Sequence, residues 1–264
     1  MSDRMKGKNV VITGASSGIG ERLAVRVAEA GGVPILLARS EEKLRALTHQ
    51  IHRQYDVEAS WFRCDVGNAD EVREVFAQVL EDVGSVNALL NNAGFGVFES
   101  VEDTSMEEFH SMFDVNVLGL IQCVKEVLPS MKQAGGGHIV NIASQAGKIS
   151  TPKSAGYAST KHAVLGFTNG LRLEVEGDGV RVMAVNLGPV RTNFFETADP
   201  EGTYKKSVER YMLDPDEVAV KVVDHLFTDK REINMPRWMD LGAKAYQVAP
   251  GLMEKMLGSQ FKKK

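Results

Sequence analysis

A chain of 264 residues is long enough to bury a large core within one domain. Its composition, 43% hydrophobic and 25% charged, is that of a globular protein and excludes a disordered or fibrous one. With 31 Lys and Arg residues against 35 Asp and Glu residues, the net charge of -4 provides no overall positive field for gathering nucleic acid or anionic lipid. We therefore expect no nucleic-acid partner.

The first residues run directly into a strand-like segment, without an apolar stretch of signal-peptide length, and no run in the chain is long enough to span a bilayer. The two cysteines, Cys64 and Cys123, lie in apolar stretches with neither Cys-x-x-Cys spacing nor a histidine cluster nearby. We expect buried free thiols, a cytoplasmic location and no integral membrane segment.

From Lys8 to about Thr228, short β-branched runs alternate with longer amphipathic ones, which is typical of parallel strands and crossover helices. The expected strands span 10–13, 34–38, 58–63, 88–90, 138–142, 180–185 and 233–235. The pattern predicts an α/β fold, a single Rossmann-type doubly wound parallel sheet of about seven strands with helices on both faces. We expect one domain over 1–264, with a catalytic core at 6–235 and an apolar appendage at 236–264.

A glycine-rich turn, from Gly14 to Gly20, directly follows the first strand, and a helical pattern begins at Glu21. Glycines let the backbone approach a pyrophosphate, whose charge is stabilised by N–H groups at the helix N-terminus. The spacing Gly-x-x-x-Gly-x-Gly differs from the general fingerprint, and alone it could be a plain βα connection. Its position after strand one favours a dinucleotide site formed by Gly14, Ser16, Ser17, Gly18, Ile19 and Gly20.

The end of the second strand, Ala38-Arg39-Ser40, carries an arginine where an acid would accept hydrogen bonds from the ribose of NAD. An arginine there binds a 2′-phosphate through charge-assisted bonds, so we expect NADP(H) as the cofactor. The alternative is a solvated charge beside Glu41 and Glu42, although these acids also suit the start of a helix capped by Ser40.

Two further turns follow strands at the edge where doubly wound sheets hold ligands. Cys64-Asp65-Val66 ends the third strand, and Asp65 can accept a hydrogen bond from an adenine amino group. Asn91-Asn92-Ala93-Gly94 ends the fourth, where asparagine and glycine also satisfy local backbone groups. The expected cofactor contacts here are Asp65, Val66, Asn92, Ala93 and Gly94.

The fifth strand leads to Ser144, and thirteen residues later Tyr157-Ala158-Ser159-Thr160-Lys161 begins a long helical pattern. A spacing of four places Tyr157 and Lys161 on one helix face. A nearby ammonium lowers the pKa of a phenol, which makes Tyr157 a proton donor, while Ser144 can hydrogen-bond the substrate oxygen. A Tyr-x-x-x-Lys spacing alone is common, but its combination with the upstream serine and the glycine turn is specific.

Together, these motifs and Asn116 resemble, in order, the short-chain dehydrogenase/reductase family over about residues 6–235. Within that family the chain resembles uncharacterised bacterial reductases of general carbonyl or hydroxy compounds. The resemblance implies that Tyr157 is the general acid and that Lys161 lowers its pKa and holds the nicotinamide ribose. It also implies that Ser144 orients the carbonyl and that Asn116 holds a water against the lysine in a proton relay.

The turn after the sixth strand departs from the family pattern Asn-Pro-Gly, because this chain has Asn186-Leu187-Gly188. The missing proline predicts a less rigid turn. The resemblance still implies cofactor contacts from Pro189, Val190 and Thr192. The long polar stretch from Leu187 to about Asp214 predicts either a functional loop, which we interpret as a mobile lid, or a pair of short helices.

Other features carry weaker implications. His49 and His52 share a helix face without a third ligand, so we expect no metal, and His162 is interpreted as structural. The apolar tail is expected to pack on the body, the substrate cleft or a partner subunit in preference to a membrane. Phenylalanines near the site, Phe95, Phe98, Phe194 and Phe195, suggest an apolar substrate pocket.

The resemblance suggests a homodimer or homotetramer formed through the helices around 105–132 and 155–176. The alternative function is a catalytically silent dinucleotide-sensing regulator that binds a protein partner. It usually lacks the tyrosine or lysine, both of which this chain has. A sugar-nucleotide epimerase would need a larger C-terminal domain. The favoured function is reduction or oxidation of a small carbonyl or alcohol.

Overall fold

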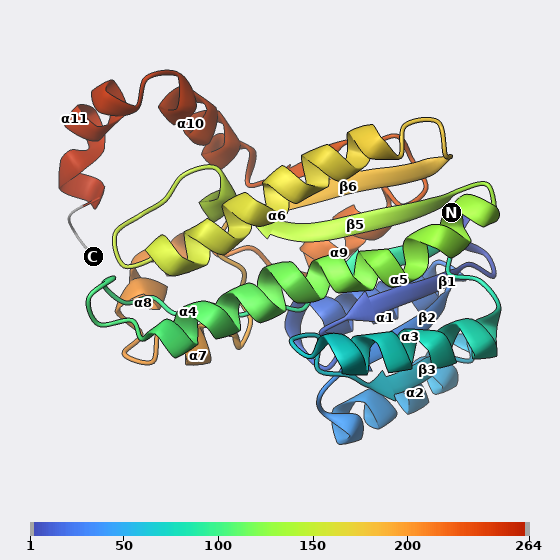
Figure 1. Cartoon of the computed structure of the whole chain (residues 1–264). Coiled ribbons are helices and arrows are strands. Elements are labelled where there is room, and N and C mark those ends of the chain that lie inside the picture. The colour runs from blue at the N-terminus through green and yellow to red at the C-terminus, as the bar shows by residue number, and fades with distance from the viewer. Residues whose placement is uncertain (1–2, 262–264) are drawn as a thin grey trace.

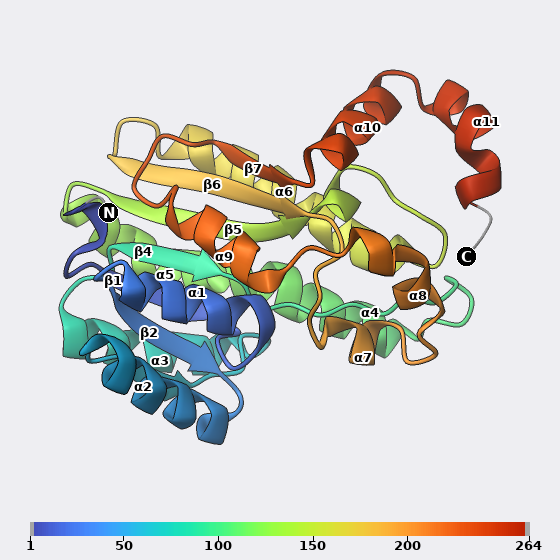
Figure 2. The same cartoon turned by 180° about the vertical axis from the view of Figure 1, so that it is seen from behind.

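The computed structural model describes residues 3–261, with side chains described for residues 4–255. Seven parallel strands form one sheet in the order β3-β2-β1-β4-β5-β6-β7 (Figures 1 and 2). The first strand, β1, lies inside the sheet. The chain adds β2 and β3 on one side of it, and then returns to add β4 to β7 on the other side. The strands are β1 (Asn9–Thr13), β2 (Val33–Ala38), β3 (Ser60–Arg63), β4 (Ala88–Asn91), β5 (Gly137–Ser144), β6 (Val180–Leu187) and β7 (Glu232–Met235).

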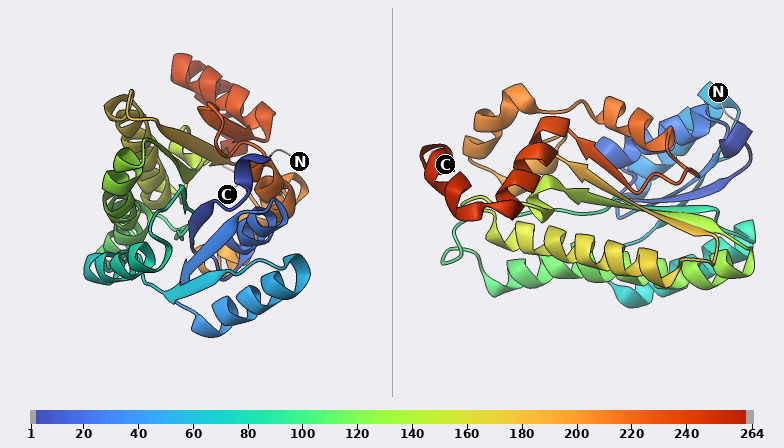
Figure 3. Two further views of the ribbon diagram at one scale, coloured as in Figure 1. Left: turned by 90° about the vertical axis from the view of Figure 1, so that its right-hand side faces the viewer. Right: turned by 90° about the horizontal axis from the view of Figure 1, so that it is seen from above.

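Helices cover both faces of this sheet, as the end-on view in Figure 3 shows. One face carries α1 (Gly18–Glu29), α2 (Glu41–Tyr55) and α9 (Pro215–Val223). The other carries α3 (Ala69–Val83), α4 (Met106–Phe113), α5 (Leu120–Gln133) and α6 (Ala155–Glu174), with a π-helical segment η2 (Asp114–Gly119) between α4 and α5. The predicted doubly wound fold is therefore confirmed.

Two apolar cores lie on opposite sides of the sheet, because alternate residues of each strand point to opposite faces. In β1, Val10 and Ile12 join the core under α1 and α9, whereas Val11 joins the core under α3 and α5. All three side chains have no exposed surface. Strands of this kind are apolar on both faces, which explains why their sequence runs are continuous.

Side-chain caps fix where several crossover helices begin. Asn68 accepts hydrogen bonds from two N–H groups in the first turn of α3, and Asp214 does the same for α9. Ser105 and Glu108 form a reciprocal capping box at the start of α4. These caps satisfy N–H groups that have no partner within their own helix.

The carboxyl ends of the strands point toward the last part of the chain (Figures 1 and 3). The segment after β6 contains α7 (Phe194–Ala198) and α8 (Thr203–Val208), which is the alternative of two short helices, and the favoured interpretation as a mobile lid stays a prediction. After β7 come α10 (Arg237–Val248) and α11 (Pro250–Phe261), which lie outside the sheet. Short 3-10 helices at Asp3–Met5, Gln145–Gly147 and Glu209–Tyr211 complete the elements.

Cys64 and Cys123 are buried and unpaired, as predicted. Burial raises the pKa of Cys64 to about 12 and also raises that of Cys123. Within residues 3–261, no helix combines the length and apolar character that crossing a membrane requires. The division of the chain at residue 235 is still a prediction.

Candidate active site

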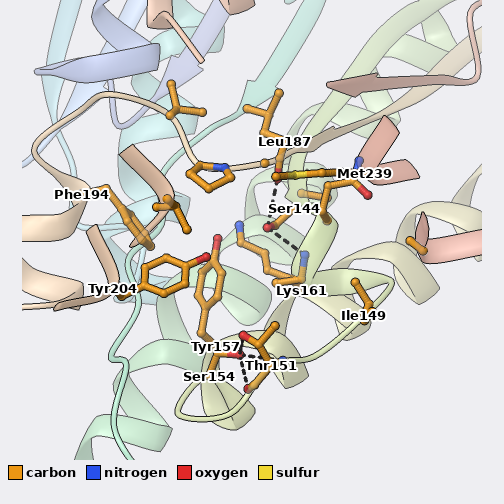
Figure 4. Close-up of a pocket in the computed structure, with 18 of the residues that line it drawn as sticks. Ser144, Ile149, Thr151, Ser154, Tyr157, Lys161, Leu187, Phe194, Tyr204 and Met239 are labelled. Carbon is orange, nitrogen blue, oxygen red and sulfur yellow. Dashed lines mark hydrogen bonds between the residues drawn. The ribbon is translucent and has the colours of Figure 1, made fainter. Parts of the chain in front are cut away.

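The side chains of Ser144, Tyr157 and Lys161 meet at the carboxyl edge of the sheet, on the wall of one cavity (Figure 4). Ser144 ends β5, and the other two lie one turn apart in α6. The Ser144 hydroxyl donates to the carbonyl oxygen of Leu187 at 3.2 Å and accepts from the N–H of Ala146 at 3.0 Å. Its position is thus fixed by strand β6 and by the 3-10 turn that follows β5.

Lys161 is buried, with 6% of its surface exposed, and its Nζ donates to the carbonyl oxygen of Ile142 at 3.0 Å. The same nitrogen lies 5.7 Å from the centre of the Tyr157 ring. Burial lowers the pKa of Lys161 to about 8, so the side chain still carries its charge at neutral pH. The lysine therefore brings a positive charge beside the phenol.

Tyr157 is partly open to the cavity, but apolar side chains surround it. This burial raises its pKa, and a hydrogen bond with Ser144 opposes the rise. Phe98 and Phe194 each place a ring centre 5.6 Å from that of Tyr157. The predicted lowering of the Tyr157 pKa by Lys161 is therefore wrong, and the phenol is held in its protonated form, the form that donates a proton.

Asn116 lies in the π-helical segment, and its side chain forms three hydrogen bonds. Its Nδ2 donates to the carbonyl oxygen of Phe95 at 2.8 Å and to Oγ1 of Thr160 at 3.0 Å, and its Oδ1 accepts from the N–H of Phe95 at 2.9 Å. Asn116 therefore joins the loop after β4 to the helix that carries Tyr157 and Lys161. Neither Thr160 nor Phe95 was identified from the sequence as part of this link.

The glycine turn has the shape of a phosphate cradle. A Cβ added to Gly20 would lie 2.2 Å from the carbonyl oxygen of Gly14, and Gly14 and Gly18 both have positive φ, at 65° and 58°. Ser17 at the N-cap of α1 makes no side-chain bond to its own helix, unlike the caps of α3 and α9. The first N–H groups of α1 are thus left for an anion, so these residues fit a dinucleotide pyrophosphate.

The loop after β4 holds this turn in place. The Thr13 hydroxyl accepts from the N–H groups of Asn92 and Ala93, both at 3.0 Å. The Asn92 side chain donates back to the carbonyl oxygens of Thr13 at 3.0 Å and Gly14 at 3.2 Å. Asn92 therefore supports the backbone, while it and Gly94 also line the cavity. Thr13 was missed because a threonine ending a strand carries no signal of its own.

Arg39 is exposed at the carboxyl end of β2, and no carboxylate within the described residues forms an ion pair with it. An exposed Arg39 without an ion pair agrees both with a contact to a 2′-phosphate and with the alternative of a solvated charge beside Glu41 and Glu42, so its role stays a prediction. Ser40 is the N-cap residue of α2, but its hydroxyl does not cap the helix, contrary to the prediction. Among the described residues, Arg39 thus forms no ion pair and the Ser40 hydroxyl forms no capping bond to α2.

Asp65 and Val66 follow β3 on the same edge. Oδ1 of Asp65 accepts from the N–H of Gly67 at 3.0 Å, and its own N–H donates to Glu71 at 3.1 Å. Val66 is buried, and its carbonyl oxygen would lie 2.2 Å from a Cβ at Gly119. The loop therefore packs directly on the π-helical segment.

The turn after β6 borders the cavity from the other side. Leu187, at the position where the family pattern has proline, is buried and pairs with Ser144 of β5 and Met235 of β7. It extends the strand through this pairing, and the lower rigidity of the turn that follows stays a prediction. Thr192 lies against the glycine turn, since a Cβ at Gly18 would come 3.1 Å from it. Pro189, Val190 and Thr192 all line the cavity.

The cavity, of about 400 Å³, is mainly apolar away from the catalytic side chains. Phe98 is at the centre of an aromatic cluster, with its ring 4.9 Å from that of Tyr204 and within 6.3 Å of those of Phe194 and Phe195. Lys161 is the only charged side chain among the residues identified on its wall. Tyr204 lies in α8 and was not predicted.

Residues of α10 and α11 form one wall of this cavity, namely Trp238, Met239, Gly242, Ala243 and Met253. The prediction that the tail packs on the substrate cleft is thereby confirmed for these residues. Met256, Leu257, Phe261 and Lys262 to Lys264, which were assigned to the same tail, lie outside the residues with described side chains.

A cluster of charges joins α10 to the catalytic loop. The Nζ of Lys148, four residues after Ser144, donates to Glu232 at 3.0 Å, Asn234 at 2.8 Å and Asp240 at 2.8 Å. Only 10% of the Lys148 side chain and 11% of that of Asp240 are exposed. Burial alone would raise the pKa of Asp240, but hydrogen bonds from Lys148 and Lys244 outweigh it, and the pKa is lowered.

The histidines form no metal site: within the described residues no group of three metal-ligating side chains occurs. His52 pairs with Glu58 at 3.2 Å, and Nδ1 of His162 bonds to the carbonyl oxygen of Ala158 at 2.9 Å. His162 is therefore bonded within α6, away from the catalytic groups.

Comparison with known proteins identifies clear relatives. Residues 8–202 match the sequence profile of the family described as short chain dehydrogenases. An uncharacterized oxidoreductase of Mycobacterium bovis is 32% identical over 99% of this chain and 76% of its own length. The alcohol dehydrogenase of the archaeon Thermococcus sibiricus, solved with 5-hydroxy-NADP, is 34% identical, with a TM-score of 0.79 over 87% of this chain and 96% of that one. Actinorhodin polyketide ketoreductase, solved with NADPH, is 32% identical, with a TM-score of 0.76 over 87% and 95%.

Proposed function

Since the chain belongs to the short-chain dehydrogenase family, we propose that it transfers a hydride between NADP(H) and a carbonyl or secondary alcohol, with Tyr157 as its acid and base. The observation that carries the proposal is the convergence of Ser144, Tyr157 and Lys161 on one cavity wall beside the glycine turn. Groups brought within reach of one substrate oxygen from two elements are what acid–base catalysis requires.

In the proposed reduction, NADPH supplies the hydride that the carbonyl carbon receives. Ser144 donates a hydrogen bond to the carbonyl oxygen and fixes its direction. Tyr157 gives its proton to that oxygen as negative charge develops, so the product is the neutral alcohol. Lys161, still charged at neutral pH, stabilises the phenolate that remains. Asn116 links the loop after β4 to α6 through hydrogen bonds to Phe95 and Thr160, which supports its proposed position beside the proton path.

The proposed cofactor residues line one continuous edge, from the glycine turn through Arg39 and Asp65 to the turn after β6. Arg39 selects NADPH through its unpaired charge, and Ser40 adds a hydroxyl beside it. Solved relatives that contain 5-hydroxy-NADP or NADPH support this choice.

The test is a pair of fluorescence titrations with NADPH and NADH, repeated on Arg39→Asp. We expect tighter binding of NADPH in the wild type and a reversed preference in the variant. Tyr157→Phe should bind NADPH normally but lose activity by about 100-fold or more. Binding of neither nucleotide would refute the oxidoreductase proposal and would favour a partner-binding role for the scaffold.

We propose a bulky, uncharged, apolar substrate, because the wall around Tyr157 consists of Phe98, Phe194, Phe195 and Tyr204. A charged substrate group would lose its hydration there without a partner. A panel of carbonyl compounds tests this directly: kcat/KM should be higher for bulky apolar ketones than for small polar ones. A preference for small polar carbonyls would contradict it.

We also propose that the enzyme is a homodimer or homotetramer built on the helices of 105–132 and 155–176. Leu118, in the π-helical segment, supports this because 57% of it is exposed on that face. A mass measurement in solution tests the assembly, and a monomer would refute it. The unpaired thiols of Cys64 and Cys123 support a reducing, cytoplasmic compartment. Cell fractionation tests that location.

A further inference from the structure

The sequence of the tail is rich in apolar and basic residues, in contrast to the rest of the chain. Residues 237–264 contain six Lys and Arg residues and two Asp and Glu residues, whereas the preceding residues contain 25 and 33. The net charge of -4 therefore conceals a tail of +4 attached to a body of -8. The negative charge of the whole chain disfavours binding to anionic surfaces, but the tail alone is positively charged and can bind them.

The outward face of α10 combines cations with large apolar side chains. Arg237, Leu241, Lys244 and Val248 follow one another at spacings of three and four, so they share one face. Leu241 is 71% exposed and Val248 is 86% exposed. The single acid of α10, Asp240, is buried at the edge of this face and forms an ion pair with Lys244 at 2.8 Å.

The same character continues on both sides of this face. Leu252 of α11 is 60% exposed. Trp238, in the first turn of α10, is 56% exposed, and its ring packs on that of Tyr211 with the ring centres 5.4 Å apart. Lys255, one turn after Leu252, is also exposed. Figure 1 shows α10 and α11 extending from the end of the sheet, away from the helices that cover its two faces. Leu241, Val248 and Leu252 are thus left largely exposed on these two helices.

We propose that α10 and α11 dock on an anionic lipid surface. Leu241, Val248 and Leu252 would enter the boundary between headgroups and acyl chains. Lysine and arginine side chains on the same face extend to the lipid phosphates. A second copy of the chain fits less well, because lysine is depleted from protein interface cores and a single helix face is small for a stable dimer.

Docking of this kind would bring the cavity close to the lipid. Met239, Ala243 and Met253 face the cavity from the same two helices whose outer sides carry the exposed apolar residues. If the proposed apolar substrate is correct, it partitions into lipid and meets the enzyme there. The docking itself does not depend on catalysis and is measured without it.

The experiment is flotation of the full chain with vesicles of phosphatidylcholine, with and without phosphatidylglycerol. We expect binding to the anionic vesicles that weakens as salt is added. Leu241→Ser and Val248→Ser should each weaken binding about fivefold or more. Lys255→Glu should weaken it about fivefold for each unit of charge.

Matched controls are available elsewhere on the surface. Leu173→Ser changes a leucine that is 69% exposed at the far end of α6, and Lys221→Glu changes an exposed lysine of α9. Both should bind vesicles like the wild type, and all variants should bind NADPH normally. The proposal is overturned if anionic vesicles do not bind at low salt, or if the tail and control variants lose binding equally. It is also overturned if the tail variants change only the particle mass without vesicles, because the face then joins two copies.

Discussion

Replacing Lys148 with methionine should destabilise the protein, because two carboxylates would keep their positions and lose their shared cation. Lys148 is 10% exposed and holds Glu232 at 3.0 Å and Asp240 at 2.8 Å. Removing one partner of a fully buried pair costs about 3–5 kcal/mol. Glu232 is 29% exposed and Lys244 still binds Asp240, so we expect about 2–3 kcal/mol here. Urea denaturation followed by circular dichroism measures this difference.

The matched control is Lys132→Met, which breaks a pair of similar length on the surface. Lys132 lies 2.6 Å from Asp178, but the two side chains are 42% and 37% exposed, so the cost should be below about 1 kcal/mol. Adding Asp240→Asn to Lys148→Met should recover part of the loss, with a coupling of about 1 kcal/mol or more. Equal costs for the two lysines, or strict additivity with Asp240→Asn, would refute the reasoning.

The same cluster predicts a pH dependence. Since the pKa values of Asp240 and Glu232 are lowered in the folded state, their contribution is present above the unfolded values and is lost as pH falls through the folded ones. The difference between wild type and Lys148→Met should therefore shrink under acidic conditions, where both carboxylates are protonated in both proteins. A difference that stays constant on acidification would contradict the ionic origin.

Three further predictions concern the site and the cores. Gly20→Ala should abolish measurable NADPH binding, because its Cβ would lie 2.2 Å from the carbonyl oxygen of Gly14. The control Gly170→Ala has open space around it in a helix, so it should bind NADPH normally and gain about 0.5–1 kcal/mol of stability. NADPH titration measures the binding of both variants, and denaturation measures their stability. Carbonyl reduction should decline as pH rises through about 8, where Lys161 loses the charge that stabilises the phenolate, and a flat pH profile across that region would oppose this role. Iodoacetamide should leave the thiol of Cys64 unmodified in the native protein, because burial raises its pKa to about 12, and should modify it in urea. Mass spectrometry measures the labelling, and rapid labelling of the native protein would show that the core is open.

The seven strands could be predicted because each apolar run is buried on both faces of the sheet. The exact ends of these strands were harder to predict from the sequence. The predicted sixth strand ended at residue 185, yet β6 continues through Asn186 and Leu187. Asn186 is a polar residue whose amide donates to Glu232 and Asn234 across the sheet. A hydrogen bond between neighbouring strands that are far apart in the sequence leaves no periodic trace there.

The candidate site divides in the same way. Ser144, Tyr157 and Lys161 have characteristic spacing, and the sequence predicts their approach before any coordinates are considered. The surrounding shell depends on contacts between distant segments, such as the Lys148 cluster, whose partners are 84 to 92 residues away. Tyr204 likewise reaches Phe98 only because α8 folds over the loop after β4.

The order of the elements along the chain has a consequence for biosynthesis. The glycine turn, Arg39 and Asp65 emerge from the ribosome early, whereas the wall formed by α10 is among the last parts to be made. Until Asp240 has been added, Lys148 lacks one of its two carboxylates. A product released or cleaved before that point retains the residues proposed to contact the nucleotide but lacks the α10 wall of the cavity. Retention on a nucleotide affinity column therefore does not certify that a preparation is intact, and the mass of the C-terminal peptide should be checked as well.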